Sequence, residues 1–84
     1  MSLMNERKKI DQIDEAIAKL INERFKVVSQ IKEIKHTEQI TLEHKDREEI
    51  IINQNMAFVD EPYKPYFLRV YKTLIEASKD FQKQ

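Results

Sequence analysis

One apolar stripe runs through residues 10–35, a stretch that contains no glycine, proline or cysteine. Its members recur at alternating steps of three and four residues, the heptad pattern of a helix that packs along its whole length. They are Ile10, Ile13, Ile17, Leu20, Val27, Ile31 and Ile34. The pattern predicts one long helix from about Asn5 to Lys35 or His36, with Ser2 or Asn5 as its N-cap.

The length of this helix sets the expected assembly. Thirty residues of helix form a rod of about 45 Å, whereas a compact chain of 84 residues has a radius of gyration of only about 12 Å. The rest of the chain is too short to cover such a rod along its length. We therefore expect an all-α fold in which a second copy of the chain completes the burial, as an intertwined helical homodimer.

Position 24 belongs to the stripe, but its residue is Arg24. A guanidinium in an apolar seam is costly unless an anion meets it. Lys35, eleven residues further on, points within about 20° of Arg24 at the helical repeat, and the two Cα atoms are about 16 Å apart along the axis. The two cations could bind a small dianion. The pattern leaves open a second interpretation, in which Arg24 extends to solvent or pairs with a glutamate across a coiled coil.

Two breaks divide the remaining sequence into two shorter helices. Residues 36–41 are polar, and residues 60–65 contain both prolines of the chain. We expect one helix from about residue 42 to 57 or 59, capped by Thr41, and another over residues 65–82 that begins with proline. The apolar side of this last helix is expected to contain Phe67, Val70, Tyr71, Leu74, Ile75 and Phe81.

Composition argues against several classes of function. The chain has no cysteine, so it has neither disulfides nor thiolate metal ligands. The spacing of His36 and His44 does not suit a metal site, and no glycine-rich phosphate loop is present. We therefore expect no cofactor and no metal. The 15 basic residues balance the 15 acidic ones, which argues against a nucleic-acid partner.

The same composition predicts where the protein works. No apolar run approaches the ~18 residues of a membrane span, and no signal peptide is apparent. We expect a cytoplasmic protein with no membrane partner. Residues 1–3 precede a second methionine at position 4 and are expected to be a cloning remnant, which leaves residues 4–84 as a single helical domain.

An ordered set of short motifs extends from residue 6 to residue 82. R-x-x-I-D-x-I-D begins at Arg7, N-E-R ends at Arg24, R-E-E begins at Arg47, and S-x-x-x-Q begins at Ser78. Together with Lys35, this order and spacing resemble the all-helical chorismate mutase family, whose members form intertwined dimers. The resemblance covers nearly the whole chain and implies a single chorismate mutase-like domain.

The resemblance implies the following roles. Arg24 and, from the partner chain, Arg7 would bind the two carboxylates of chorismate. Lys35 would contact a carboxylate and the ether oxygen, and Gln82 would donate a hydrogen bond to the same oxygen. Ile31, Ile51 and Ile75 would form apolar walls.

The resemblance assigns the rest of the site to the second and third helices. Glu48 would hold the ring hydroxyl, and Arg47 and Ser78 would support carboxylate binding and order the pocket. Three residues before Arg47 the family usually has an aspartate that orders the hydroxyl side of the substrate, whereas this chain has His44.

The implied function is the Claisen rearrangement of chorismate to prephenate, in the shikimate pathway of aromatic amino-acid biosynthesis. This unimolecular reaction needs a folded substrate and donors at the ether oxygen, and it needs no nucleophile. One alternative is an isochorismate pyruvate lyase, which breaks the same ether bond on the same scaffold. Another is a catalytically weak helical module that regulates or docks on a second enzyme, and His44 keeps this alternative open.

Overall fold

Helices form nearly all of the described part of the chain. The computed structural model describes residues 2–38 and 45–84, and these ranges contain helices and no strand. In chain order the elements are α1 (Leu3–Glu38), α2 (Lys45–Met56), the short 3₁₀ helix η1 (Glu61–Tyr63) and α3 (Lys64–Gln82). The expected all-α fold of one long and two shorter helices is confirmed. No described helix has both the length and the apolarity to cross a membrane.

The rod predicted from the stripe is α1, an unbroken helix of 36 residues. Its N-terminus is capped by Ser2, whose Oγ accepts a hydrogen bond from the Asn5 backbone N–H at 3.1 Å. Since no helix-breaking residue interrupts the pattern, α1 is longer than expected at both ends. It accounts for the longest dimension of the chain, 55 Å, and for a radius of gyration of 15.9 Å, above the value of a compact chain of this length.

The two prolines mark the connection between the shorter helices. α2 ends at Met56, slightly before the expected end, and its expected start and cap at Thr41 lie outside the described residues. Pro62 lies in η1, a 3₁₀ element that the sequence did not indicate. α3 begins at Lys64, one residue before Pro65, and ends at Gln82 as expected.

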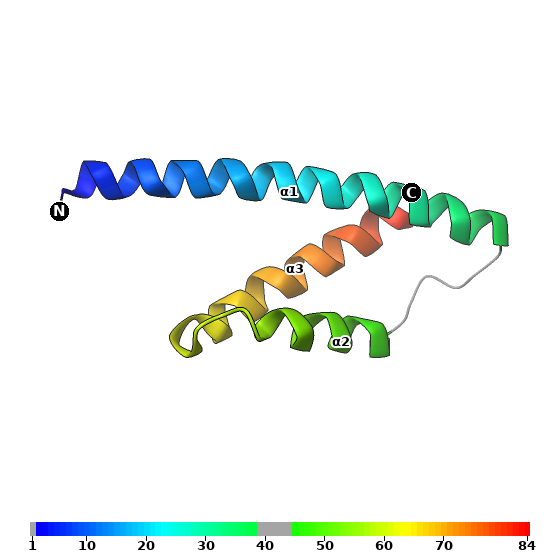
Figure 1. Cartoon of the computed structure of the whole chain (residues 1–84). Helices are drawn as coiled ribbons and strands as arrows, with labels where there is room; N and C mark the ends of the chain where they lie inside the picture. Colours follow the sequence, from blue (N-terminus) through cyan, green and yellow to red (C-terminus); the bar gives the residue numbers. More distant parts are fainter. Residues whose placement is uncertain (1, 39–44) are drawn as a thin grey trace.

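The third helix, α3, joins the other two (Figure 1). Its C-terminal half crosses the C-terminal half of α1, and its N-terminal half packs against α2. The rings of Phe25 and Phe81 meet edge to face where α1 and α3 cross, with centroids 5.8 Å apart. The Lys32 ammonium lies 5.2 Å from the centre of the Phe81 ring. These contacts fix the end of α3 on α1.

The side of α1 that packs on α3 is centred on Val28 and not on the apolar stripe. Val28 is 6% exposed, whereas its stripe neighbour Val27 is 54% exposed. One residue corresponds to a rotation of about 100° around a helix, so the stripe lies to one side of the contact with α3. On α3, Ile75 is buried as expected, but Val70 is 68% exposed. In the single chain Val70 therefore lies outside the packed part of the apolar side, which is centred on Ile75 and Ser78.

Candidate active site

Where α1 crosses α3, a guanidinium meets a buried hydroxyl. Nη1 of Arg24 donates a hydrogen bond to Oγ of Ser78, which is one of the buried side chains of the described part of the chain. The same hydroxyl donates to the carbonyl oxygen of Leu74 at 2.9 Å. On its other side, Arg24 has its Cζ 6.0 Å from the centre of the Tyr71 ring. Arg24 is therefore held by two residues of α3, and its other guanidinium N–H groups can bind a carboxylate.

One turn further along α3, a second cation meets a side-chain amide. Nζ of Lys35 lies 3.4 Å from Oε1 of Gln82. Nε2 of Gln82 lies 3.4 Å from the backbone carbonyl of Ser78 and donates to it. Because the amide NH₂ carries two hydrogens, it can keep this bond and still donate to a ligand. An ammonium and an amide donor thus lie together at one end of the site.

The hydroxyl side of the expected site contains an ion pair between helices. Oε1 of Glu48 on α2 lies 2.7 Å from Nζ of Lys79 on α3. The family resemblance implied no cationic partner for Glu48 and no role for Lys79. The position of Lys79 next to Ser78 in the sequence could have indicated that it lies near the site. Only the packing of α2 on α3 shows which acidic residue it pairs with.

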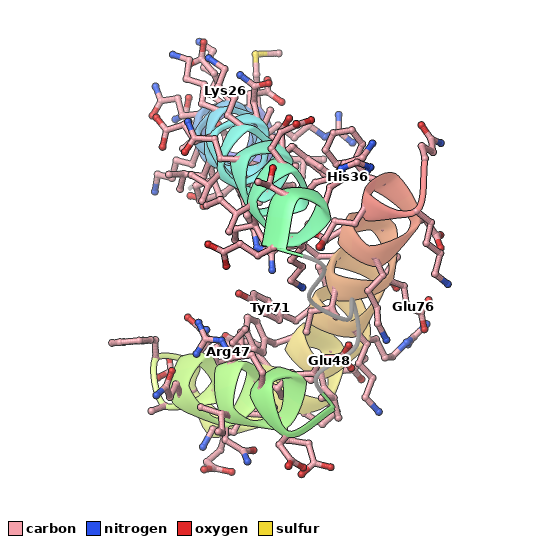
Figure 2. The ribbon with its side chains drawn as sticks, turned by 90° about the vertical axis from the view of Figure 1, so that its right-hand side faces the viewer. Lys26, His36, Arg47, Glu48, Tyr71 and Glu76 are labelled. Carbon is pink, nitrogen blue, oxygen red and sulfur yellow. The ribbon has the colours of Figure 1, made fainter. Side chains whose placement is uncertain are left out.

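The structure brings most of the predicted site together. Arg24, Lys35, Ser78 and Gln82 are linked in pairs where α1 and α3 cross, and Glu48 approaches α3 from α2. In Figure 2, Arg47 of α2 and Tyr71 of α3 both point into the space between the ribbons of α1 and α2, and Glu48 lies toward α3.

Arg7 is not part of this group. Arg7 is exposed and lies near the N-terminal end of α1, far from the crossing. It is seventeen residues before Arg24, which corresponds to about 25 Å of helix. His44 lies outside the described residues. Of the predicted walls, Ile75 is buried, Ile51 is half-buried and Ile31 is 39% exposed.

The fold and the site define a class of protein: an all-helical chain that gathers two cations, an amide and a hydroxyl where two helices cross. The chain belongs to the chorismate mutase type II family, whose model matches residues 6–83. It is 35% identical over 80 residues to a chorismate mutase of Methanocaldococcus jannaschii, with 93% of this chain and 81% of that protein covered.

A second relative is a larger protein. The chain is 32% identical over 83 residues to a bifunctional chorismate mutase/prephenate dehydratase of Aquifex aeolicus. This match covers 93% of the chain but only 23% of the relative, so the chain spans about a quarter of that protein. No solved structure matches the chain significantly.

Proposed function

We propose that this chain is a chorismate mutase that converts chorismate to prephenate in aromatic amino-acid biosynthesis. Membership of the chorismate mutase type II family supports the reaction. The observation that carries the assignment of the site is the pairing of Arg24 with Ser78 and of Lys35 with Gln82 across the α1–α3 crossing.

The reaction is a rearrangement within one molecule. The ether C–O bond of chorismate breaks while a C–C bond forms, so the enzyme must hold the flexible side chain of the substrate over its ring. In our proposal Arg24 binds one carboxylate and the partner's Arg7 binds the other. Each removes rotational freedom that the free substrate would have to lose on its own.

The ether oxygen gains negative charge as its bond to carbon breaks. Lys35 and Gln82 are proposed to donate hydrogen bonds to it. Nζ of Lys35 lies 3.4 Å from the amide oxygen of Gln82 in this structure, and the NH₂ group of the same amide keeps one hydrogen beyond its bond to the Ser78 carbonyl. A ligand oxygen that binds beside both groups can therefore accept from each. Donors that are in place before the reaction stabilise the transition state more than the ground state.

The test is turnover by the purified chain. We expect chorismate to be consumed with formation of prephenate, and isochorismate to release no pyruvate at a comparable rate. Release of pyruvate from isochorismate would instead assign the lyase activity. Binding of chorismate without turnover would assign a regulatory module, and neither binding nor turnover would refute the proposal.

Replacement of Gln82 by glutamate should make activity depend on pH. The introduced carboxyl can donate to the ether oxygen only when it is protonated, so kcat/KM should rise as pH falls toward the carboxyl range. The Lys35 ammonium favours the ionised carboxyl, which places this rise near or below the ordinary glutamate pKa of about 4.3. A pH–rate profile of Gln82→Glu beside the wild type measures the effect. If the two profiles have the same shape, Gln82 does not contact the ether oxygen.

We infer that the active form is a homodimer, and we keep the cytoplasmic setting expected from the sequence. The N-terminal half of α1 extends beyond α2 and α3 (Figure 1). Its apolar side chains are 46–70% exposed in the single chain: Leu3, Met4, Ile10, Ile13, Ile17 and Leu20. Burial of apolar surface contributes about 25 cal/mol of free energy per Å² removed from water. A second α1 that covers these side chains would therefore stabilise both chains.

Folding should therefore be coupled to association, and the thermal midpoint should rise with protein concentration. Ile13→Glu should lower the midpoint and favour the monomer. Gln12→Glu introduces the same side chain on the neighbouring position, off the stripe, and should leave the midpoint nearly unchanged. Calorimetry over a concentration series and sedimentation measure both effects. A fully helical monomer at micromolar concentration would contradict the dimer.

A further inference from the structure

The ion pair between Lys79 and Glu48 differs from the other ion pairs of the described residues. The other three join residues three or four apart in sequence, and each includes a partner at least 68% exposed. Lys79 and Glu48 come from different helices, and their side chains are only 24% and 26% exposed. Exposed pairs contribute little to stability, but a half-buried pair between helices fixes the direction of both side chains.

The position of Lys79 connects this pair to the site. Lys79 follows Ser78, the partner of Arg24, and precedes Gln82, the partner of Lys35, within one turn of α3. The same turn therefore supports the carboxylate and ether end of the site through Ser78 and Gln82, and reaches Glu48 on α2 through Lys79.

We propose that Lys79 is a positioning residue that orients Glu48 toward the ring hydroxyl of the substrate, an inference that rests on the proposed mutase function. Oε1 of Glu48 accepts from the Lys79 ammonium at 2.7 Å. This contact directs the second carboxylate oxygen, Oε2, to the hydroxyl. A carboxylate can accept hydrogen bonds at both oxygens, so the two contacts do not compete.

The positive charge of Lys79 also offsets the negative charge of Glu48. The substrate carries two carboxylates, and an uncompensated Glu48 would repel them in a poorly solvated site. The ammonium of Lys79 compensates the charge of Glu48 without contacting the substrate. Glu48 can then accept a hydrogen bond from a neutral hydroxyl on a dianionic ligand.

The experiment compares Lys79→Met, Lys79→Arg and Lys64→Met. Methionine keeps the length of the side chain and removes its charge, whereas arginine keeps the charge. Lys64 is the matched control, because it lies on the same helix and pairs with Glu61 at 2.6 Å. The hydroxyl contact exists in both the ground state and the transition state, so Lys79→Met should raise KM about tenfold with little change in kcat. Lys79→Arg should restore most of the loss, and Lys64→Met should behave as the wild type.

A pair of ligands separates positioning from a merely structural role. The probes are a bicyclic diacid ether that imitates the transition state and the same compound without its ring hydroxyl. Lys79→Met should weaken binding of the first about tenfold and binding of the second distinctly less, because the second probe loses only the charge compensation and no oriented hydrogen bond. Lys79→Leu, which likewise cannot donate to Glu48, carries the same comparison where Lys79→Met does not fold. Equal weakening of both ligands, or no weakening of either, would overturn the proposal. Wild-type turnover of chorismate tests the mutase function by itself, so the two failures are distinguishable.

Discussion

Replacing Lys35 with methionine should lower kcat for chorismate by about 10²–10³-fold, the usual effect of removing one donor from a developing oxyanion. The ammonium lies 3.4 Å from the amide oxygen of Gln82, at the end of the site where the ether oxygen is proposed to bind. Methionine has nearly the same length and cannot donate a hydrogen bond. Because the charge on the ether oxygen is largest in the transition state, kcat should fall more than KM rises.

Lys32 provides the matched control for this variant. It lies on the same helix three residues earlier, and its ammonium lies over the ring of Phe81 instead of beside Gln82. Lys32→Met should lose about 0.5–1 kcal/mol of stability from the cation–π contact and keep its kcat. Steady-state kinetics at saturating chorismate and thermal melts measure the two effects. Equal losses of kcat in both variants would show that Lys35 acts through the general charge of α1, and the assignment of the ether-oxygen contact would then be wrong.

The sequence predicted the long helix well because its signal is local and repeated. Residues 10–35 contain no helix breaker, and the heptad stripe extends through most of α1. The same stripe did not predict which side of α1 packs on α3. Val28 is buried there and Val27 is not, because the contact is set by the angle at which α3 crosses. Crossing angles depend on pairs of surfaces, which one periodic pattern does not describe.

The residues of the candidate site were likewise predicted only in part. The motif order identified Arg24, Lys35, Ser78 and Gln82, and the structure pairs them across the crossing. The motif order did not identify Lys79, because an ion pair between α2 and α3 depends on how two separate helices pack. For Arg7 the single chain offers no partner in the site, and its role stays a prediction of the resemblance. Each of these gaps concerns tertiary or quaternary contacts and not local structure.

Two inactive variants, Arg7→Ala and Lys35→Ala, should together restore activity when they are co-expressed. On α1 the two residues are 28 positions apart, about 42 Å along the helix. No small ligand can touch both on one rod, so a site that uses both must take Arg7 from an antiparallel partner. In a mixed dimer one site then carries both substitutions and the other carries neither. Random pairing makes half of the dimers mixed, each with one intact site, so activity should reach about a quarter of the wild type.

The control for this experiment is the pair Arg24→Ala and Lys35→Ala. Both residues are proposed to serve the site of their own chain, since both meet α3 of that chain. Each site of this mixed dimer therefore carries one substitution, and activity should stay at the level of the single variants. The chains must be co-expressed or refolded together, because intertwined chains exchange slowly, and native mass spectrometry measures the mixed fraction. If confirmed mixed dimers of Arg7→Ala and Lys35→Ala are as inactive as the control pair, Arg7 does not serve the site of the partner chain and the shared site is wrong.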